Sequence, residues 1–211
     1  MNKEEFLEEL EKLNIILTVK QQAQLELFYN LLIEWNQKIN LTRITKKEEV
    51  YLKHFYDSLT LAKVIDLSKI DTLCDVGTGA GFPGIVLKIV YPNLKITLID
   101  SLQKRVNYLN EIISKLNLKE ITAIHTRGED YQNTFDIVTA RAVANIEKLL
   151  KYTMHLVNEN GKMIAMKGNI EEELNDKVQK QIESRYKIEQ IEKFHLPIEN
   201  SQRSLIVITR K

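Results

Sequence analysis

The sequence predicts an α/β fold, in which a mostly parallel seven-stranded sheet with an antiparallel last strand follows an N-terminal helical extension. Residues 1–69 show helical spacing of apolar side chains and contain no glycine or proline. From Asp71 onward, short apolar runs alternate with helical patterns, which is typical of parallel strands joined by crossover helices. The final two apolar runs follow one another without a helix between them, so we expect their strands to pair antiparallel.

The N-terminal region is expected to contain three helices. Apolar residues recur at helical spacing over residues 6–13 and predict the first. Thr18, with Gln21 three residues later, forms a capping-box pattern that predicts the start of the second helix. Thr45 with Glu48 forms the same pattern and predicts the start of the third.

We expect the chain to have two regions: an N-terminal helical region, 1–69, packed on the core, and a sheet-containing domain, 70–211. The apolar runs predict strands at Thr72–Val76, Lys95–Asp100, Ile121–His125, Phe135–Ala140, Lys162–Met166, Lys187–His195 and Leu205–Thr209. The helical patterns between them predict helices at Gly84–Val90, Leu102–Leu116, Asn145–Leu156 and Ile170–Glu183.

The composition excludes several protein classes. The 211 residues carry 30 Lys and Arg against 29 Asp and Glu, a balance that argues against a nonspecific nucleic-acid coat but allows a local basic patch. The single cysteine cannot form an internal disulfide, and the four scattered histidines lack the spacing of a zinc site. No run approaches the roughly 18 apolar residues of a membrane span. We therefore expect a protein of the reducing cytoplasm, without a metal ion or a membrane contact. A monomer is expected as well, although no pattern in the sequence tests the oligomeric state.

Four of the seven glycines fall within eight residues, between the first predicted strand and the helix after it: Gly77, Gly79, Gly81 and Gly84. Glycine lets the backbone turn tightly and approach a ligand without a Cβ in the way. This window predicts a cradle for a small molecule.

Two ligand classes fit the window. The G-x-G-x-x-G pattern that begins at Gly79 is typical of dinucleotide binding, whereas Asp75 followed by Gly77, Gly79 and Gly81 resembles the first motif of Rossmann-like class I S-adenosylmethionine (SAM) methyltransferases. A carboxylate would repel a pyrophosphate at the helix N-terminus, but it suits the sulfonium and ammonium cations of SAM. Asp75 therefore favours SAM. The alternatives are a dinucleotide site and a structural turn that binds no ligand. Asp100, which ends the second predicted strand, could accept hydrogen bonds from the ribose of either ligand.

The segment after the fourth predicted strand constrains the methyl acceptor. It contains no Asn/Asp-Pro-Pro-Tyr, the sequence that amino-group methyltransferases place against an exocyclic amine. Carbon-5 methylation of pyrimidines uses a cysteine nucleophile, but Cys74 lies within the first predicted strand, where a buried structural role is expected. These absences favour an acceptor with a free lone pair, such as guanine N7, which needs no proton removed before attack.

The sequence resembles the bacterial 16S ribosomal RNA guanine-N7 methyltransferase family, also known as glucose-inhibited division protein B, over nearly the whole chain. The motifs that carry the resemblance are Trp35-Asn36, Asn40-Leu41-Thr42, His54 with Asp57-Ser58-Leu59, Phe82-Pro83-Gly84, Leu98-Ile-Asp-Ser101 with Lys104-Arg105, Arg127-Gly-Glu129, Arg141-Ala142 and Lys167-Gly168.

The resemblance implies methyl transfer from SAM to N7 of guanine 527 of 16S rRNA in the small ribosomal subunit. It also implies that Gly77, Phe82, Gly128, Glu129 and Arg141 contact SAM. With the glycine window and the end of the second strand included, the expected cofactor-binding residues are Asp75, Gly77, Gly79, Phe82, Asp100, Ser101, Gly128, Glu129 and Arg141. A SAM-dependent enzyme acting on another RNA or on a small molecule is the alternative.

Arg141 is the candidate catalytic residue, because it follows the fourth predicted strand and its guanidinium could hold the methionine carboxylate or guanine O6. No general base is expected. Lys104 and Arg105 begin a helix, where they could contact RNA phosphates or simply face solvent. The resemblance adds Lys167 and Arg203 as RNA-binding residues.

His54 and Asp57 lie three positions apart and share a helix face. We expect them to tie the helical region to the α/β domain through a hydrogen bond, rather than to contact substrate.

Overall fold

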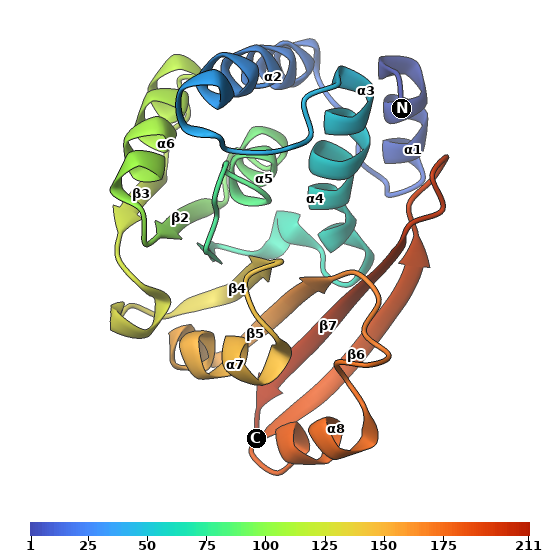
Figure 1. Ribbon diagram of the computed structural model, residues 1–211, viewed down its shortest axis with the longest axis vertical. Helices are drawn as coiled ribbons and strands as arrows, with labels where there is room; N and C mark the ends of the chain where they lie inside the picture. Colours follow the sequence, from blue (N-terminus) through green and yellow to red (C-terminus); the bar gives the residue numbers. More distant parts are fainter.

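The computed structural model describes residues 1–211 and shows one mixed sheet with helices on both faces (Figure 1). The strands are β1 (Thr72–Val76), β2 (Lys95–Asp100), β3 (Ile121–His125), β4 (Phe135–Arg141), β5 (Val157–Lys167), β6 (Tyr186–His195) and β7 (Gln202–Arg210). Their order across the sheet is β3-β2-β1-β4-β5-β7-β6. Strand β7 pairs antiparallel with both β5 and β6, and the other pairs are parallel. The predicted fold class and the antiparallel final pair are confirmed.

Eight α-helices accompany the sheet: α1 (Lys3–Glu11), α2 (Val19–Ile39), α3 (Lys47–Val50), α4 (Asp57–Leu59), α5 (Gly84–Val90), α6 (Gln103–Lys115), α7 (Ile146–Thr153) and α8 (Asp176–Glu183). A π-helical segment, Tyr51–Tyr56, joins α3 to α4. Such segments are uncommon and often occur at functional sites.

Strand alternation sorts the core into two layers. Successive residues of a strand point to opposite faces, so Leu73 faces the layer that contains α1 to α6, while Cys74 faces α7 and α8. The first layer also contains Phe6 and Phe28 from the N-terminal helices. The predicted boundary at residues 69 and 70 falls just before β1, and side chains from both sides of it share one core.

Of the two helix starts predicted from capping-box patterns in the N-terminal region, one is confirmed and one is wrong. The Thr18 prediction is confirmed, because Thr18 Oγ1 accepts from the Gln21 backbone N–H at 3.2 Å and Gln21 Oε1 accepts from the Thr18 N–H at 2.9 Å. The prediction at Thr45 is wrong. Helix α3 begins after Lys46 without a side-chain cap, and the carbonyl of Thr45 instead accepts a hydrogen bond from the Tyr29 hydroxyl.

The helix predicted over Ile170–Glu183 is shorter than expected. Helix α8 begins only at Asp176, because the side chain of Asn175 accepts from the Val178 N–H and caps it there. The residues before Asn175 form turns.

No helix of the chain is both long and apolar enough to span a bilayer.

Candidate functional site

The glycine window forms the turn between β1 and α5. Gly77, Gly79 and Gly81 have φ angles of +71°, +59° and +93°, a region that other L-residues adopt only with strain. The N–H groups of Gly77 and Thr78 donate to the carbonyl of Ile99 at 2.8 and 3.1 Å, which holds the turn against the end of β2. The cluster of glycines is therefore a requirement of the backbone at this turn.

Asp75 lies beneath the turn, fully buried at the end of β1. Its Oδ2 accepts from Thr78 Oγ1 at 2.7 Å and from the Gly84 N–H at 2.9 Å, while Oδ1 has no partner. Burial raises the pKa of Asp75 to about 6. The carboxylate occupies the N-terminus of α5, which is the position a dinucleotide pyrophosphate would need. This placement disfavours a dinucleotide.

A cavity of about 320 Å³ opens beside the turn at the carboxyl ends of β1, β2 and β3; we call it the cofactor cavity. It is lined by Val76, Gly77, Ile99, Asp100, Ser101, Thr126, Arg127, Gly128, Glu129, Val143 and Tyr152. Five of the predicted cofactor-binding residues are among them: Gly77, Asp100, Ser101, Gly128 and Glu129. The volume lies within the range of small-molecule sites.

Asp100 is the most constrained acid of this cavity. Its Oδ2 accepts from the Gly79 N–H at 3.0 Å and from Arg105 Nη1 at 3.3 Å, and its Oδ1 accepts from the Leu102 N–H at 2.9 Å. A carboxylate oxygen can accept two hydrogen bonds, so Oδ1 keeps one acceptor position. The structure thus places Arg105, predicted to bind RNA, in an ion pair with a residue of the cofactor cavity.

The cofactor cavity fits SAM. A Cβ on Gly77 would come within 2.7 Å of the Val143 side chain, so the close approach of the backbone depends on glycine there. Two carboxylates, Asp100 and Glu129, line the cavity against one cation, Arg127. That balance suits the cationic groups and hydroxyls of SAM better than a phosphate.

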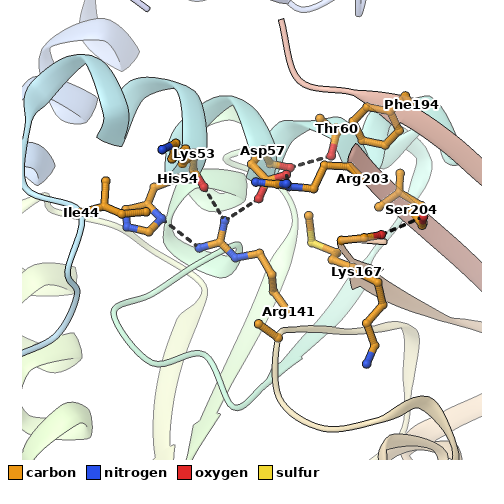
Figure 2. Close-up of a pocket in the computed structure, with 14 residues that line it drawn as sticks. Ile44, Lys53, His54, Asp57, Thr60, Arg141, Lys167, Phe194, Arg203 and Ser204 are labelled. Atoms are coloured by element: carbon orange, nitrogen blue, oxygen red, sulfur yellow. Dashed lines mark hydrogen bonds and ion pairs between the residues drawn. The ribbon is translucent and has the colours of Figure 1, made fainter. Parts of the chain in front are cut away.

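A second cavity, of about 360 Å³, includes the last residue of β4, Arg141, in its lining (Figure 2). It is lined by Ile44, Lys53, His54, Asp57, Thr60, Arg141, Ala142, Met166, Lys167, Gly168, Phe194, Arg203, Ser204 and Leu205. Four of these residues are Lys or Arg and only one is an acid, so we call it the cationic cavity.

Asp57 holds two of the cations in place. Its Oδ2 accepts from Arg141 Nη1 at 3.2 Å, and its Oδ1 accepts from Arg203 Nε at 3.0 Å (Figure 2). Arg141 Nη1 also donates to the carbonyl of Lys53 at 3.1 Å. Because all of these groups are largely buried, the pairing offsets the cost of removing the charges from water.

His54 completes this network in its neutral form. Its Nδ1 lies 3.3 Å from Arg141 Nη2, and since a guanidinium can only donate, Nδ1 is the acceptor. The proton of the ring is then on Nε2, which donates to Thr42 Oγ1 at 3.0 Å. Burial, with the nearby charge of Arg141, lowers the pKa of His54 to about 3. The expected structural tie is present, but it is made to Arg141 at the cavity.

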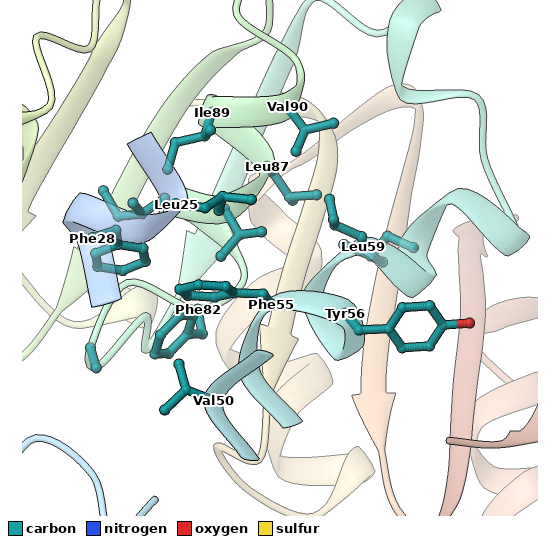
Figure 3. Close-up of a cluster of buried hydrophobic side chains, with 14 of the residues drawn as sticks. Leu25, Phe28, Val50, Phe55, Tyr56, Leu59, Phe82, Leu87, Ile89 and Val90 are labelled. Atoms are coloured by element: carbon teal, nitrogen blue, oxygen red, sulfur yellow. The ribbon is translucent and has the colours of Figure 1, made fainter. Parts of the chain in front are cut away.

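Phe82 packs between the His54–Arg141 pair and the aromatic side chains of the helical layer. Its ring stacks on His54 at a centroid distance of 4.4 Å, lies 5.2 Å from the Arg141 guanidinium, and contacts Phe28 and Phe55 of the helical layer (Figure 3). Only 5% of Phe82 is exposed. The structure therefore places its side chain away from the cofactor cavity, where the resemblance implied a contact.

The other predicted site residues lie outside the cofactor cavity. Asp75, Gly79 and Phe82 support the glycine turn without lining the cofactor cavity, and Arg141 lines the cationic cavity instead. Lys167 and Arg203 also line the cationic cavity, where Lys167 donates to Glu173 Oε1 at 2.7 Å and to the carbonyl of Ala144. Lys104 is exposed at the start of α6 without an ion pair.

Sequence reasoning missed Lys53, Ile44 and Phe194 as parts of a site. Lys53 immediately precedes His54 in the π-helical segment, and no local pattern marks its carbonyl as a partner of Arg141. Ile44 and Phe194 belong to a loop and an edge strand that only the fold brings together. No group of three or more His, Cys, Asp or Glu side chains is placed to hold a metal ion.

Comparison with known proteins places these cavities in context. The family model GidB, described as rRNA small subunit methyltransferase G, matches residues 21–206. Ribosomal RNA small subunit methyltransferase G of Bacillus subtilis is 45% identical over 217 aligned positions, which cover 100% of this chain and 91% of that protein. The protein of the same name from Macrococcus caseolyticus is 49% identical over 80% of this chain and 73% of its own length.

Solved structures share the fold at low identity. A variant of MtNAS in complex with S-adenosylmethionine matches with a TM-score of 0.61 and 14% identity, covering 90% of this chain and 76% of that one. A SAM-dependent methyltransferase from Aquifex aeolicus matches with a TM-score of 0.58 and 19% identity, covering 83% of this chain and 97% of that one. The predicted Rossmann-like class I methyltransferase fold is confirmed.

Proposed function

Because this chain belongs to the rRNA small subunit methyltransferase G family, we propose that it transfers a methyl group from SAM to N7 of guanine 527 of 16S rRNA in the small ribosomal subunit. In this proposal the enzyme acts as a monomer in the cytoplasm and needs no metal ion.

One observation supports this function above the others: two cavities of different character meet at the end of β4. Arg141 and Ala142 line the cationic cavity, and Val143 lines the cofactor cavity. A methyl donor beside the glycine turn and a base from a polyanion in the cationic cavity would thus both contact the same three consecutive residues, 141–143. Parallel α/β sheets commonly bind ligands at this edge.

SAM supplies an activated methyl group on its sulfonium. Gly77, Asp100, Ser101, Gly128 and Glu129 line the cofactor cavity and would hold it there. The absence of a side chain at Gly77 would let the backbone approach the ligand, and the two carboxylates would accept hydrogen bonds from its hydroxyl and amine groups. The remaining task of the chain is to hold the acceptor base in line with that methyl group, which is catalysis by positioning.

Arg141 has donors left for the acceptor. A guanidinium has five N–H groups, and three of those on Arg141 bind Asp57, the Lys53 carbonyl and His54. The Nε–H and one Nη2–H stay uncommitted. They could donate to guanine O6, which lies beside N7 on the same edge of the base.

The cationic cavity offers no free general base. Both carboxylate oxygens of Asp57 accept from arginines, and both ring nitrogens of His54 are committed. Cys74 is buried within β1, and burial raises the pKa of its thiol. An acceptor that must lose a proton before attack finds no partner in this arrangement, whereas guanine N7 carries a free lone pair. This supports N7 over an exocyclic amine.

The test is methylation of small ribosomal subunits isolated from cells that lack the corresponding gene. The protein is incubated with labelled SAM and these subunits, and the labelled nucleotide is identified and located in 16S rRNA. We expect label in N7-methylguanine at position 527. Label at another atom or in another RNA would replace the proposed substrate, and transfer to a metabolite with no label in RNA would favour the small-molecule alternative.

A further inference from the structure

We propose that the loop of residues 40–46, here called the rim loop, is a docking surface for the RNA backbone, with Arg43 and Lys46 contacting phosphates beside the target base. The proposal rests on the proposed function and extends it to Arg43 and Lys46, which no sequence motif singled out.

The rim loop borders the cationic cavity. It joins α2 to α3 (Figure 1), and the side chain of Ile44 lines the cavity beside His54 (Figure 2). Arg43 precedes Ile44 directly and Lys46 follows it by two positions. An RNA strand that delivers a base into this cavity would therefore pass the two cations at its edge.

Hydrogen bonds give the loop one shape. Thr42 N–H donates to Asn36 Oδ1 at 2.8 Å, and Thr42 Oγ1 accepts from the Ile44 N–H at 3.0 Å and from His54 Nε2. Asn40 takes a left-handed conformation at the end of α2, with φ of +50°. A loop already ordered in this way loses little conformational entropy when it binds a partner.

The cations of the rim loop are free, whereas those inside the cavity are paired. Arg43 and Lys46 are exposed and their side chains form no hydrogen bond or ion pair. Inside the cavity, Arg141 and Arg203 bind Asp57, and Lys167 binds Glu173. Lys53, also in the cavity, forms ion pairs with Glu49 and Glu199.

Unpaired, exposed cations are the groups that RNA phosphates recognise. Residues 40–46 contain no acid, so the loop carries two positive charges and no negative one. Phosphate contacts fix the position of a nucleic acid without reading its sequence, and each contact contributes to the salt dependence of binding. Two contacts at the rim would align the strand while the cavity receives the base.

The experiment compares Arg43→Ala, Lys46→Ala and the double variant with the matched control Lys20→Ala. Lys20 is also exposed and unpaired, but it lies at the opposite end of α2, a helix about 30 Å long. Binding to unmethylated small subunits is measured over a range of salt concentrations, together with KM and kcat for methylation. Affinity for SAM serves as the check of folding.

We expect each single substitution to weaken binding of the subunit and raise KM roughly 3- to 10-fold, with kcat and SAM affinity unchanged. In the double variant, the slope of log affinity against log salt should flatten by about 1.4, the value for two phosphates of a single strand. Arg43→Lys should retain most of the affinity, and Lys20→Ala should match the wild type.

An unchanged salt slope in the double variant would overturn the proposal, as would an equal loss in Lys20→Ala. A fall in kcat without a change in KM or binding would also count against it, because the loop would then shape the active site rather than bind RNA. Since subunit binding is measured separately from methylation, a wild type that binds but methylates nothing would refute the proposed function and still test the loop.

Discussion

The two cavities differ in what builds them. The cofactor cavity is shaped by backbone at the ends of neighbouring strands, with glycines at its closest points. The cationic cavity is shaped largely by charged side chains from the N-terminal region, β4, β5 and β7, and Asp57 binds two of them, Arg141 and Arg203. Damage to the first should therefore act through steric strain, and damage to the second through unpaired charge.

The largest effect is expected from Asp57→Ala. Removal of the carboxylate leaves Arg141 and Arg203 largely buried without their anion, a change that typically costs about 3–5 kcal/mol. Chemical denaturation should show this loss, and methylation should fall with it. Affinity for SAM should change little at a temperature where the variant is folded. Asp57→Asn, which keeps the shape and one acceptor, should lose less, and equal stability of wild type and Asp57→Ala would remove the basis for this comparison.

The next effect is a pH dependence from His54. Its pKa is lowered to about 3 in the folded chain, against about 6.5 when unfolded, so unfolding takes up a proton at acidic pH. The stability contribution is complete above pH 6.5 and is lost as the pH falls toward 3. Between pH 7 and pH 5 the loss through this group is about 2 kcal/mol.

His54→Gln provides the comparison, because glutamine does not titrate. Denaturation of both proteins across this pH range should show the stability of the wild type relative to His54→Gln decreasing as the pH falls. Parallel curves would mean that His54 is not held neutral by the cavity.

Gly77→Ala should affect the cofactor cavity selectively. The new Cβ would sit 2.7 Å from Val143 at a φ of +71°, and the left-handed conformation alone costs about 1–2 kcal/mol. We expect SAM affinity, measured by calorimetry, to fall roughly 10-fold, with RNA binding retained. Gly168→Ala adds the same methyl group at the cationic cavity, where its nearest neighbour is 3.9 Å away, and SAM affinity should stay at the wild-type value. Equal losses in the two variants would contradict the distinction.

The smallest effect is expected from Lys104→Ala. Lys104 is exposed and unpaired, so its removal can only weaken a phosphate contact, by about 2- to 5-fold at low salt. Arg105→Ala is the informative partner, since Arg105 binds Asp100 and its loss should also lower SAM affinity. A filter-binding assay with subunits and a titration with SAM separate the two. Loss of SAM affinity in Lys104→Ala would assign this residue to the cofactor cavity.

Much of the fold was predictable from the residues. The strand positions follow from short apolar runs that alternate with helical patterns, and the cap at Thr18 follows from a pattern within four residues. At Thr45, where the prediction is wrong, the loop makes contacts that no local pattern indicates: Tyr29 binds the carbonyl of Thr45, and Thr42 ties the loop to His54. A local pattern predicts local structure only where no tertiary contact competes.

The candidate site shows the same division. The glycine turn was visible in the sequence because backbone conformation at each position depends mainly on that residue and its neighbours. The cationic cavity was not, since Asp57 and Arg203 lie 146 positions apart and form an ion pair only in the folded chain. The residues alone indicated which cations the protein has, but the tertiary structure decides which of them are neutralised by acids and which, like Arg43 and Lys46, stay free. Charge pairing depends on distance in space, and that distance is set by long-range packing.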